Sequence, residues 1–157
     1  MKLVTLKKAT AAALIALLSV PALAFALVSG TCRGAWNLPD TTLTGSMYGT
    51  LTDSSGQQAF TLKAELQSFL VLGPLGDAGT FSGKLDTGSG AAFPAYTVAG
   101  TYAGSSLAQS GFFQGQVYYQ VSQLGPIAAV GRIQGQYSDP ATFPSKGQFK
   151  GTWTANL

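Results

Sequence analysis

The stretch FQGQVYYQV, residues 113–121, decides the fold because its two kinds of side chain alternate one by one. Its odd-numbered residues are apolar, aromatic or small: Phe113, Gly115, Val117, Tyr119 and Val121. The residues between them are three glutamines and Tyr118. Successive side chains of a β-strand point to opposite faces, so a period of two predicts a strand with one buried face and one wet face.

The same period recurs at residues 43–51, 60–66, 79–86, 97–102, 132–137 and 148–155, and 32–38 is a plausible eighth strand. Short stretches rich in Gly, Ser, Asp and Pro lie between these segments. They are too short for a crossover helix, so neighbouring strands should pair antiparallel. We predict an all-β fold, an antiparallel meander of seven to eight strands that forms a closed or nearly closed small barrel. A β-sandwich is the alternative.

An internal duplication accompanies the strand pattern. Gly-Thr recurs at 49, 100 and 151, and LGPLGDAGTFSGKL (72–85) aligns without gaps on LGPIAAVGRIQGQY (124–137). We interpret this as two units of about 51 residues, approximately 43–95 and 96–153. Each unit would hold three strands, so the second should run antiparallel to the first, about a pseudo-twofold axis.

Glycines recur on the presumed inner face of these strands. A glycine inside a strand costs about 0.5–1 kcal/mol relative to alanine, so this pattern calls for a compensating use. Bare backbone permits sharp coiling and lets a neighbouring aromatic ring lie across it. Burial of such a ring contributes roughly 1.5–3 kcal/mol, which offsets the penalty.

The first 26 residues resemble a secretory signal peptide. Lys2, Lys7 and Lys8 precede an apolar run, and small residues fit cleavage after Ala24 or Ala26. We therefore expect a secreted or periplasmic protein with one all-β domain over 27–157. An uncleaved membrane anchor is the alternative, but Pro21 interrupts the run.

Charge and cysteine content limit the partners. Three of the nine basic residues lie in the predicted signal peptide, which leaves six against six acidic residues, and this balance favours neither nucleic acid nor an anionic membrane. The single cysteine, Cys32, cannot form an internal disulfide. Lipidation or an intermolecular disulfide are its alternatives to remaining an unmodified residue.

Few residues offer catalytic chemistry. The chain has no histidine, which excludes histidine triads and histidine-rich zinc sites. Asp86 and Asp139 occupy corresponding turns of the two units and are the remaining carboxylate pair, but Asp in a turn ordinarily bonds to local backbone. We predict no enzyme activity, no metal and no cofactor.

The aromatic residues are the remaining candidates for a site. We predict that Tyr102, Tyr119, Tyr137 and Trp153 line the barrel interior and contact a small ligand, unless they simply fill the core. Phe112 and Tyr118 lie on the opposite face, where neighbouring rings would suit stacking on a sugar or docking to a partner.

Three functional classes follow. The first is a non-catalytic domain that binds an unknown small molecule or protein. The second is a structural or surface-assembly protein whose uncharged Thr, Gln, Ser and Gly faces pack sideways against copies of itself. An outer-membrane barrel is the third. Such barrels usually have long loops on one rim and short turns on the other, whereas the connections here are of similar length at both ends, so membrane insertion is not expected.

Overall fold

The computed structural model of the chain describes residues 26–38, 43–69, 78–105, 110–138 and 145–157. Within these ranges eight strands follow one another: β1 (Leu27–Leu38), β2 (Thr44–Asp53), β3 (Gln58–Phe69), β4 (Ala78–Asp86), β5 (Ala95–Ser105), β6 (Ser110–Gln120), β7 (Ile127–Ser138) and β8 (Ser145–Asn156). Each strand pairs antiparallel with its neighbours in the sequence, as the alternation predicts.

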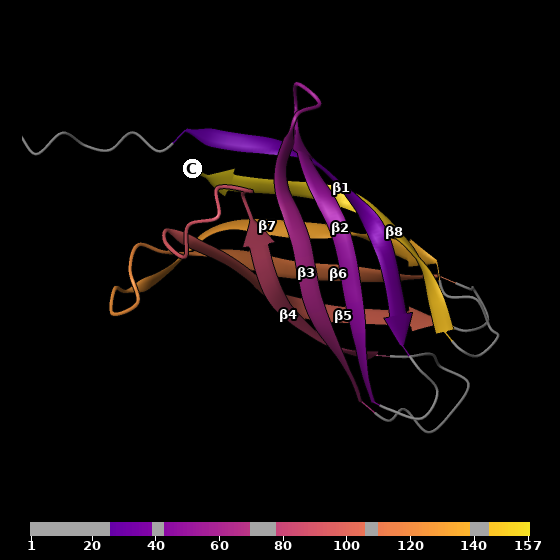
Figure 1. Cartoon of the computed structure of the whole chain (residues 1–157). Coiled ribbons are helices and arrows are strands. Elements are labelled where there is room, and N and C mark those ends of the chain that lie inside the picture. Colours follow the sequence, from indigo (N-terminus) through magenta and orange to yellow (C-terminus); the bar gives the residue numbers. More distant parts are fainter. Residues whose placement is uncertain (1–25, 39–42, 70–77, 106–109, 139–144) are drawn as a thin grey trace, which may run out of the picture.

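The sheet closes on itself between the first and last strands (Figure 1). β1 pairs with β8 along its whole length, from Leu27 opposite Asn156 to Leu38 opposite Ser145. The predicted eighth strand is therefore β1, and it begins at Leu27 rather than Cys32. Closure confirms the barrel prediction, and the β-sandwich alternative is wrong.

Two irregularities bend the wall. The pairing shifts register between Leu51 and Thr52 in β2, and between Val117 and Tyr118 in β6. Such bulges increase the local twist of a sheet. In Figure 1, β2, β3 and β4 accordingly cross the direction of β5, β6 and β7 at a wide angle.

Most of the large apolar residues of the strands point into the barrel, with exposed exceptions such as Phe69 and Phe112. Leu51, Leu62 and Val117 are fully buried, and their polar neighbours in the chain face outward. Val121 was predicted to continue the inner face of its strand, which is wrong: β6 ends at Gln120 and Val121 is exposed.

Aromatic rings lie against the inner glycines, as the glycine pattern predicts. A Cβ added at Gly34 or Gly49 would lie 2.6 Å from the ring of Phe149. One added at Gly100 would lie 2.6 Å from the ring of Phe81. The bare backbone therefore makes the room that these rings occupy.

The predicted duplication can be placed on the barrel. Gly49, Gly100 and Gly151 lie at inward positions of β2, β5 and β8. Two strands, β3 and β4, lie between β2 and β5 in the antiparallel meander, so β2 and β5 run in opposite directions. The duplication itself remains a prediction, and so does the signal peptide, since residues 1–25 lie outside the described ranges.

Candidate functional site

The four aromatic residues predicted to contact a ligand all lie on the inner wall, but they occupy two different ends. Trp153 packs with its ring centroid 5.6 Å from that of Phe60, and its Nε1 donates to the carbonyl of Thr52 at 3.0 Å. Tyr119 lies beside Tyr96, with ring centroids 5.0 Å apart. Trp153 is 1% exposed, so at this end the rings fill the core.

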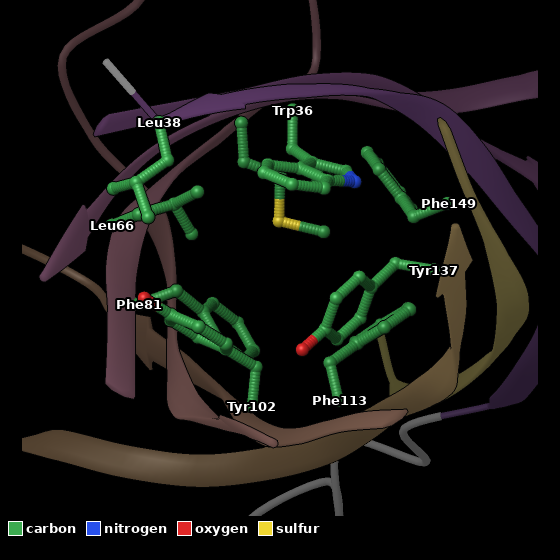
Figure 2. A pocket seen from close by; sticks show the side chains of 9 residues that line it. Trp36, Leu38, Leu66, Phe81, Tyr102, Phe113, Tyr137 and Phe149 are labelled. Atoms are coloured by element: carbon green, nitrogen blue, oxygen red, sulfur yellow. The ribbon is translucent and has the colours of Figure 1, made fainter. Parts of the chain in front are cut away.

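Tyr102 and Tyr137 lie together at the other end, with ring centroids 6.1 Å apart. The hydroxyls of Tyr102 and Ser68 share a hydrogen bond of 2.5 Å. Figure 2 shows the side chains around the cavity here, which are almost all apolar or aromatic. They are Trp36, Leu38, Met47, Leu66, Phe81, Tyr102, Phe113, Tyr137 and Phe149.

The interior cavity is small. Its volume is about 30 Å³. A single water needs about 10–15 Å³ by this measure, whereas sites for drug-sized ligands measure about 300–1,000 Å³. The cavity therefore has room for one or two water-sized groups, and a larger ligand would have to displace flexible side chains such as that of Met47.

A much larger hollow lies on the outer face of the same wall. Its volume is about 870 Å³, and it extends over five adjacent strands, β5, β6, β7, β8 and β1. The pairing registers place its ten outward-facing residues in two rows across these strands. One is the amide row, and the other is the mixed row.

The amide row consists of hydroxyl and amide side chains that are direct cross-strand neighbours: Thr31, Thr152, Gln134, Gln114 and Thr101. Its five strands are separated by four spacings of about 4.8 Å, so the row is about 19 Å long. All five side chains are exposed. Each can both donate and accept hydrogen bonds.

The mixed row runs parallel to the amide row and lies two residues away from it on each strand. It consists of Arg33, Lys150, Gln136, Phe112 and Ala103. Phe112 is 65% exposed, as expected for a ring on the outer face. Tyr118 was also expected to present an exposed ring on the outer face. Its side chain is instead half-buried, and its hydroxyl donates to Oε1 of Gln116 at 3.1 Å. Tyr118 does not line the hollow.

The hollow follows from the shape of a closed twisted sheet. A barrel of tilted, twisted strands is a hyperboloid, narrowest near mid-height. The amide row lies near the middle of its strands, whereas Gln136, Phe112 and Ala103 of the mixed row are each the third residue from a strand end. Gly135 and Gly151, on the inward phase between the two rows, add backbone to the lining.

A second hollow of about 590 Å³ adjoins the first around the β1–β8 pair. Arg33 and Lys150 line both hollows. Thr50, Gln148 and Ala35 line the second one. The two cations therefore stand at the junction of a continuous depression in the outer surface.

The other residues considered for catalysis or metal binding do not form a site among the described residues. Asp86 accepts a hydrogen bond from the backbone N–H of Gly88 at 2.7 Å, which is turn chemistry, and Asp139 lies outside the described residues. Within the described part of the chain, no group of three or more His, Cys, Asp or Glu side chains could hold a metal ion.

Cys32 points into the barrel and is 1% exposed. Burial is the main cause that raises the pKa of its thiol to about 12, and a backbone hydrogen bond opposes the rise. Lipidation or an intermolecular disulfide would require this sulfur at the surface. The fold therefore favours a thiol that stays protonated and unmodified.

Sequence reasoning found the inner aromatics but not the outer hollow. In the sequence, Gln114 and Gln134 are simply two of the polar residues that alternate with apolar ones in their strands. Their juxtaposition depends on which strands pair and in which register. A sequence signal exists in retrospect, because these strands place Gln or Thr at the same outward phase.

No helix among the described residues is long and apolar enough to cross a membrane. No protein-family model matches the chain, and neither the curated proteins nor the solved structures contain a significant match.

Proposed function

We propose that the protein is an exported, non-catalytic binding domain that holds a carbohydrate chain in the hollow on its outer face. One observation carries this proposal: a depression of about 870 Å³ whose lining combines the hydroxyl and amide side chains of the amide row with two cations, an exposed ring and other apolar groups. Export rests on the signal-like first 26 residues.

The chemistry of the amide row suits a sugar. Carbohydrate hydroxyls both donate and accept hydrogen bonds, and so do the side chains of Thr and Gln. The exposed ring of Phe112 adds an apolar surface on which a sugar ring can stack. A row about 19 Å long favours a chain of several sugar units over a single small molecule.

The interior of the barrel gives much less support to binding of a small molecule than the outer hollow gives to binding of a carbohydrate. Its cavity of about 30 Å³ is about ten times smaller than the smallest typical ligand pocket. The predicted ligand residues Trp153 and Tyr119 lie away from it. Of the four, Tyr102 and Tyr137 line the cavity, and they contact one another.

The geometry bears differently on the two alternatives. Self-assembly by strand addition would need a free edge, and β1 and β8 are paired with each other along their length. Sideways packing of uncharged outer faces needs no edge and remains the alternative function. A membrane-spanning barrel needs an apolar band on its outside, whereas the outward mid-strand positions around the hollow are mostly Thr and Gln.

Affinity electrophoresis of the purified protein in gels containing xylan, a mixed-linkage glucan, polygalacturonate or its methyl ester tests the proposal. We expect retardation by at least one polymer, and a loss of affinity of about tenfold or more in Phe112→Ala and Gln134→Ala. Tyr137→Phe, a change inside the barrel, should leave the affinity unchanged.

Matched controls lie outside the hollow on β3. Phe69 is 56% exposed and Gln67 is also exposed, and neither lines a hollow described above. Phe69→Ala and Gln67→Ala should therefore bind like the unaltered protein. If no polymer retards the protein, or if all four variants lose affinity alike, the proposed function is wrong.

A further inference from the structure

Charge is distributed unevenly around the barrel, although the domain is balanced overall. β1 and β5–β8 carry four basic residues and not one Asp or Glu: Arg33, Arg132, Lys146 and Lys150. All the acidic residues of the described strands lie on β2, β3 and β4: Asp53, Glu65 and Asp86. The wall that carries the hollow is therefore its basic side.

Arg33 and Lys150 are directly opposite each other in the β1–β8 pairing. Like charges directly opposite each other destabilise a sheet. The outward cross-strand neighbours that flank the pair are Thr50 on β2 and Gln136 on β7. Within the described strands, no carboxylate faces either cation from a neighbouring position.

A second cation pair provides an internal comparison. Lys63 and Lys84 are directly opposite each other in the β3–β4 pairing. Glu65 follows Lys63 by two residues on the outer face, and Asp86 follows Lys84 by two residues. This pair has carboxylates close by, whereas the pair at the hollow has none, so the hollow can accept a negative charge from outside.

We infer that the ligand of the outer hollow is an acidic polysaccharide, whose carboxylate is bound by Arg33 and Lys150 while its hydroxyls lie along the amide row. This inference rests on the proposed function and names the chemical class of the chain. A guanidinium binds a carboxylate with two parallel hydrogen bonds, and an ammonium adds a compact charge.

The lining distinguishes this ligand from other polyanions. A surface for single-stranded nucleic acid combines a track of cations with several rings on which bases stack. The hollow has two cations at one end, one exposed ring, and hydroxyl or amide groups elsewhere. That composition fits a chain with many hydroxyls and occasional carboxylates.

The test compares polygalacturonate with its fully methyl-esterified form, because the two share a backbone and differ in the carboxylate. Isothermal titration of the purified protein at low ionic strength should give at least tenfold tighter binding to the free acid. The difference should shrink as salt rises, since exposed charges are screened.

The double variant Arg33→Gln/Lys150→Gln should lose this preference and still bind the ester. Lys63→Gln/Lys84→Gln removes the same charge from the opposite wall and should keep the preference. Thermal unfolding should show both variants folded, because all four side chains are exposed.

The outcomes separate the two proposals. If neither polymer binds, the proposed function fails, and this inference with it. Equal binding of both polymers would overturn the inference and leave the carbohydrate function standing. A preference lost equally in both double variants, or equally tight binding of single-stranded DNA, would show a general polyanion surface and also overturn it.

Discussion

The inner and outer faces of β6 differ although their residues alternate in one strand. Phe113 and Val117 point inward and are 4% and 0% exposed, and the rings and glycines of other strands surround them. Phe112 and Gln114 point outward, line the outer hollow and are exposed. A single step along the chain therefore separates a residue that packs the core from one that can contact a ligand.

This difference assigns stability and recognition to different residues. An inner side chain is held by close-packed neighbours, so adding or removing even one methylene there changes the stability of the fold. An outer side chain on the same strand has few neighbours and can change at little cost. We expect variants of the inner face to change unfolding, and variants of the outer hollow to change binding.

The largest contrast should come from two aromatic residues, one on each face. Trp153→Ala removes a ring that is 1% exposed and a hydrogen bond to the carbonyl of Thr52. We expect a loss of about 3–5 kcal/mol in the free energy of unfolding. Phe112→Ala should change it by no more than about 0.5 kcal/mol. Urea unfolding of both variants checks this, and losses of similar size would refute the division between faces.

A smaller effect should follow from adding a single methyl group to the inner face. In Gly100→Ala the new Cβ would meet the carbonyl of Gln114 and lie 2.6 Å from the Phe81 ring. Because backbone cannot move aside cheaply, we expect a loss of about 2–3 kcal/mol.

Ala99→Val adds more atoms on the outward side of the same strand and is the control. Its free energy of unfolding should stay within about 0.5 kcal/mol of the unaltered protein. Thermal and urea unfolding measure both variants. A tolerated Gly100→Ala would mean that the ring does not depend on bare backbone there.

The smallest expected effect is the pH dependence contributed by Cys32. Burial raises the pKa of its thiol to about 12 in the fold, from about 9.0 for a thiol exposed to water. Above pH 9 the unfolded chain loses this proton while the folded protein keeps it, so stability falls as pH rises from about 9 towards 12. Between pH 7 and pH 10 the loss is about 1.4 kcal/mol.

Cys32→Ala supplies the control, because it lacks this titration and keeps the others. The free energy of unfolding of the unaltered protein should fall more steeply between pH 7 and pH 10 than that of the variant. Parallel pH profiles would contradict the burial of the thiol.

The sequence predicted the strands because one face of each is buried, which imposes a period of two on residues such as Phe113, Gly115 and Val117. It also predicted that rings would lie on glycines, since glycines on the inner face of strands need a compensating contact. The start of β1 was set too late because Gly30 has no side chain and so gives no apolar signal at the inward position between Val28 and Cys32.

The outer hollow could not be predicted in the same way. It depends on register, which places Gln134 between Thr152 and Gln114 across three strands. The net charge of the domain also gave no indication of its basic side, because net charge does not say which strands carry the basic residues or which strands are neighbours. The interior predictions for Tyr119 and Trp153 identified the correct face but not the end at which space remains.

Amide chemical-shift mapping with a galacturonate oligomer tests the central claim most directly. We predict that the shifts concentrate on β1 and β5–β8 around Arg33, Gln134 and Lys150, and that those around Lys63 and Glu65 do not change. Shifts concentrated on the inward residues Trp36 and Tyr137, or on β2–β4, would contradict the claim that the outer face of this barrel is its binding surface.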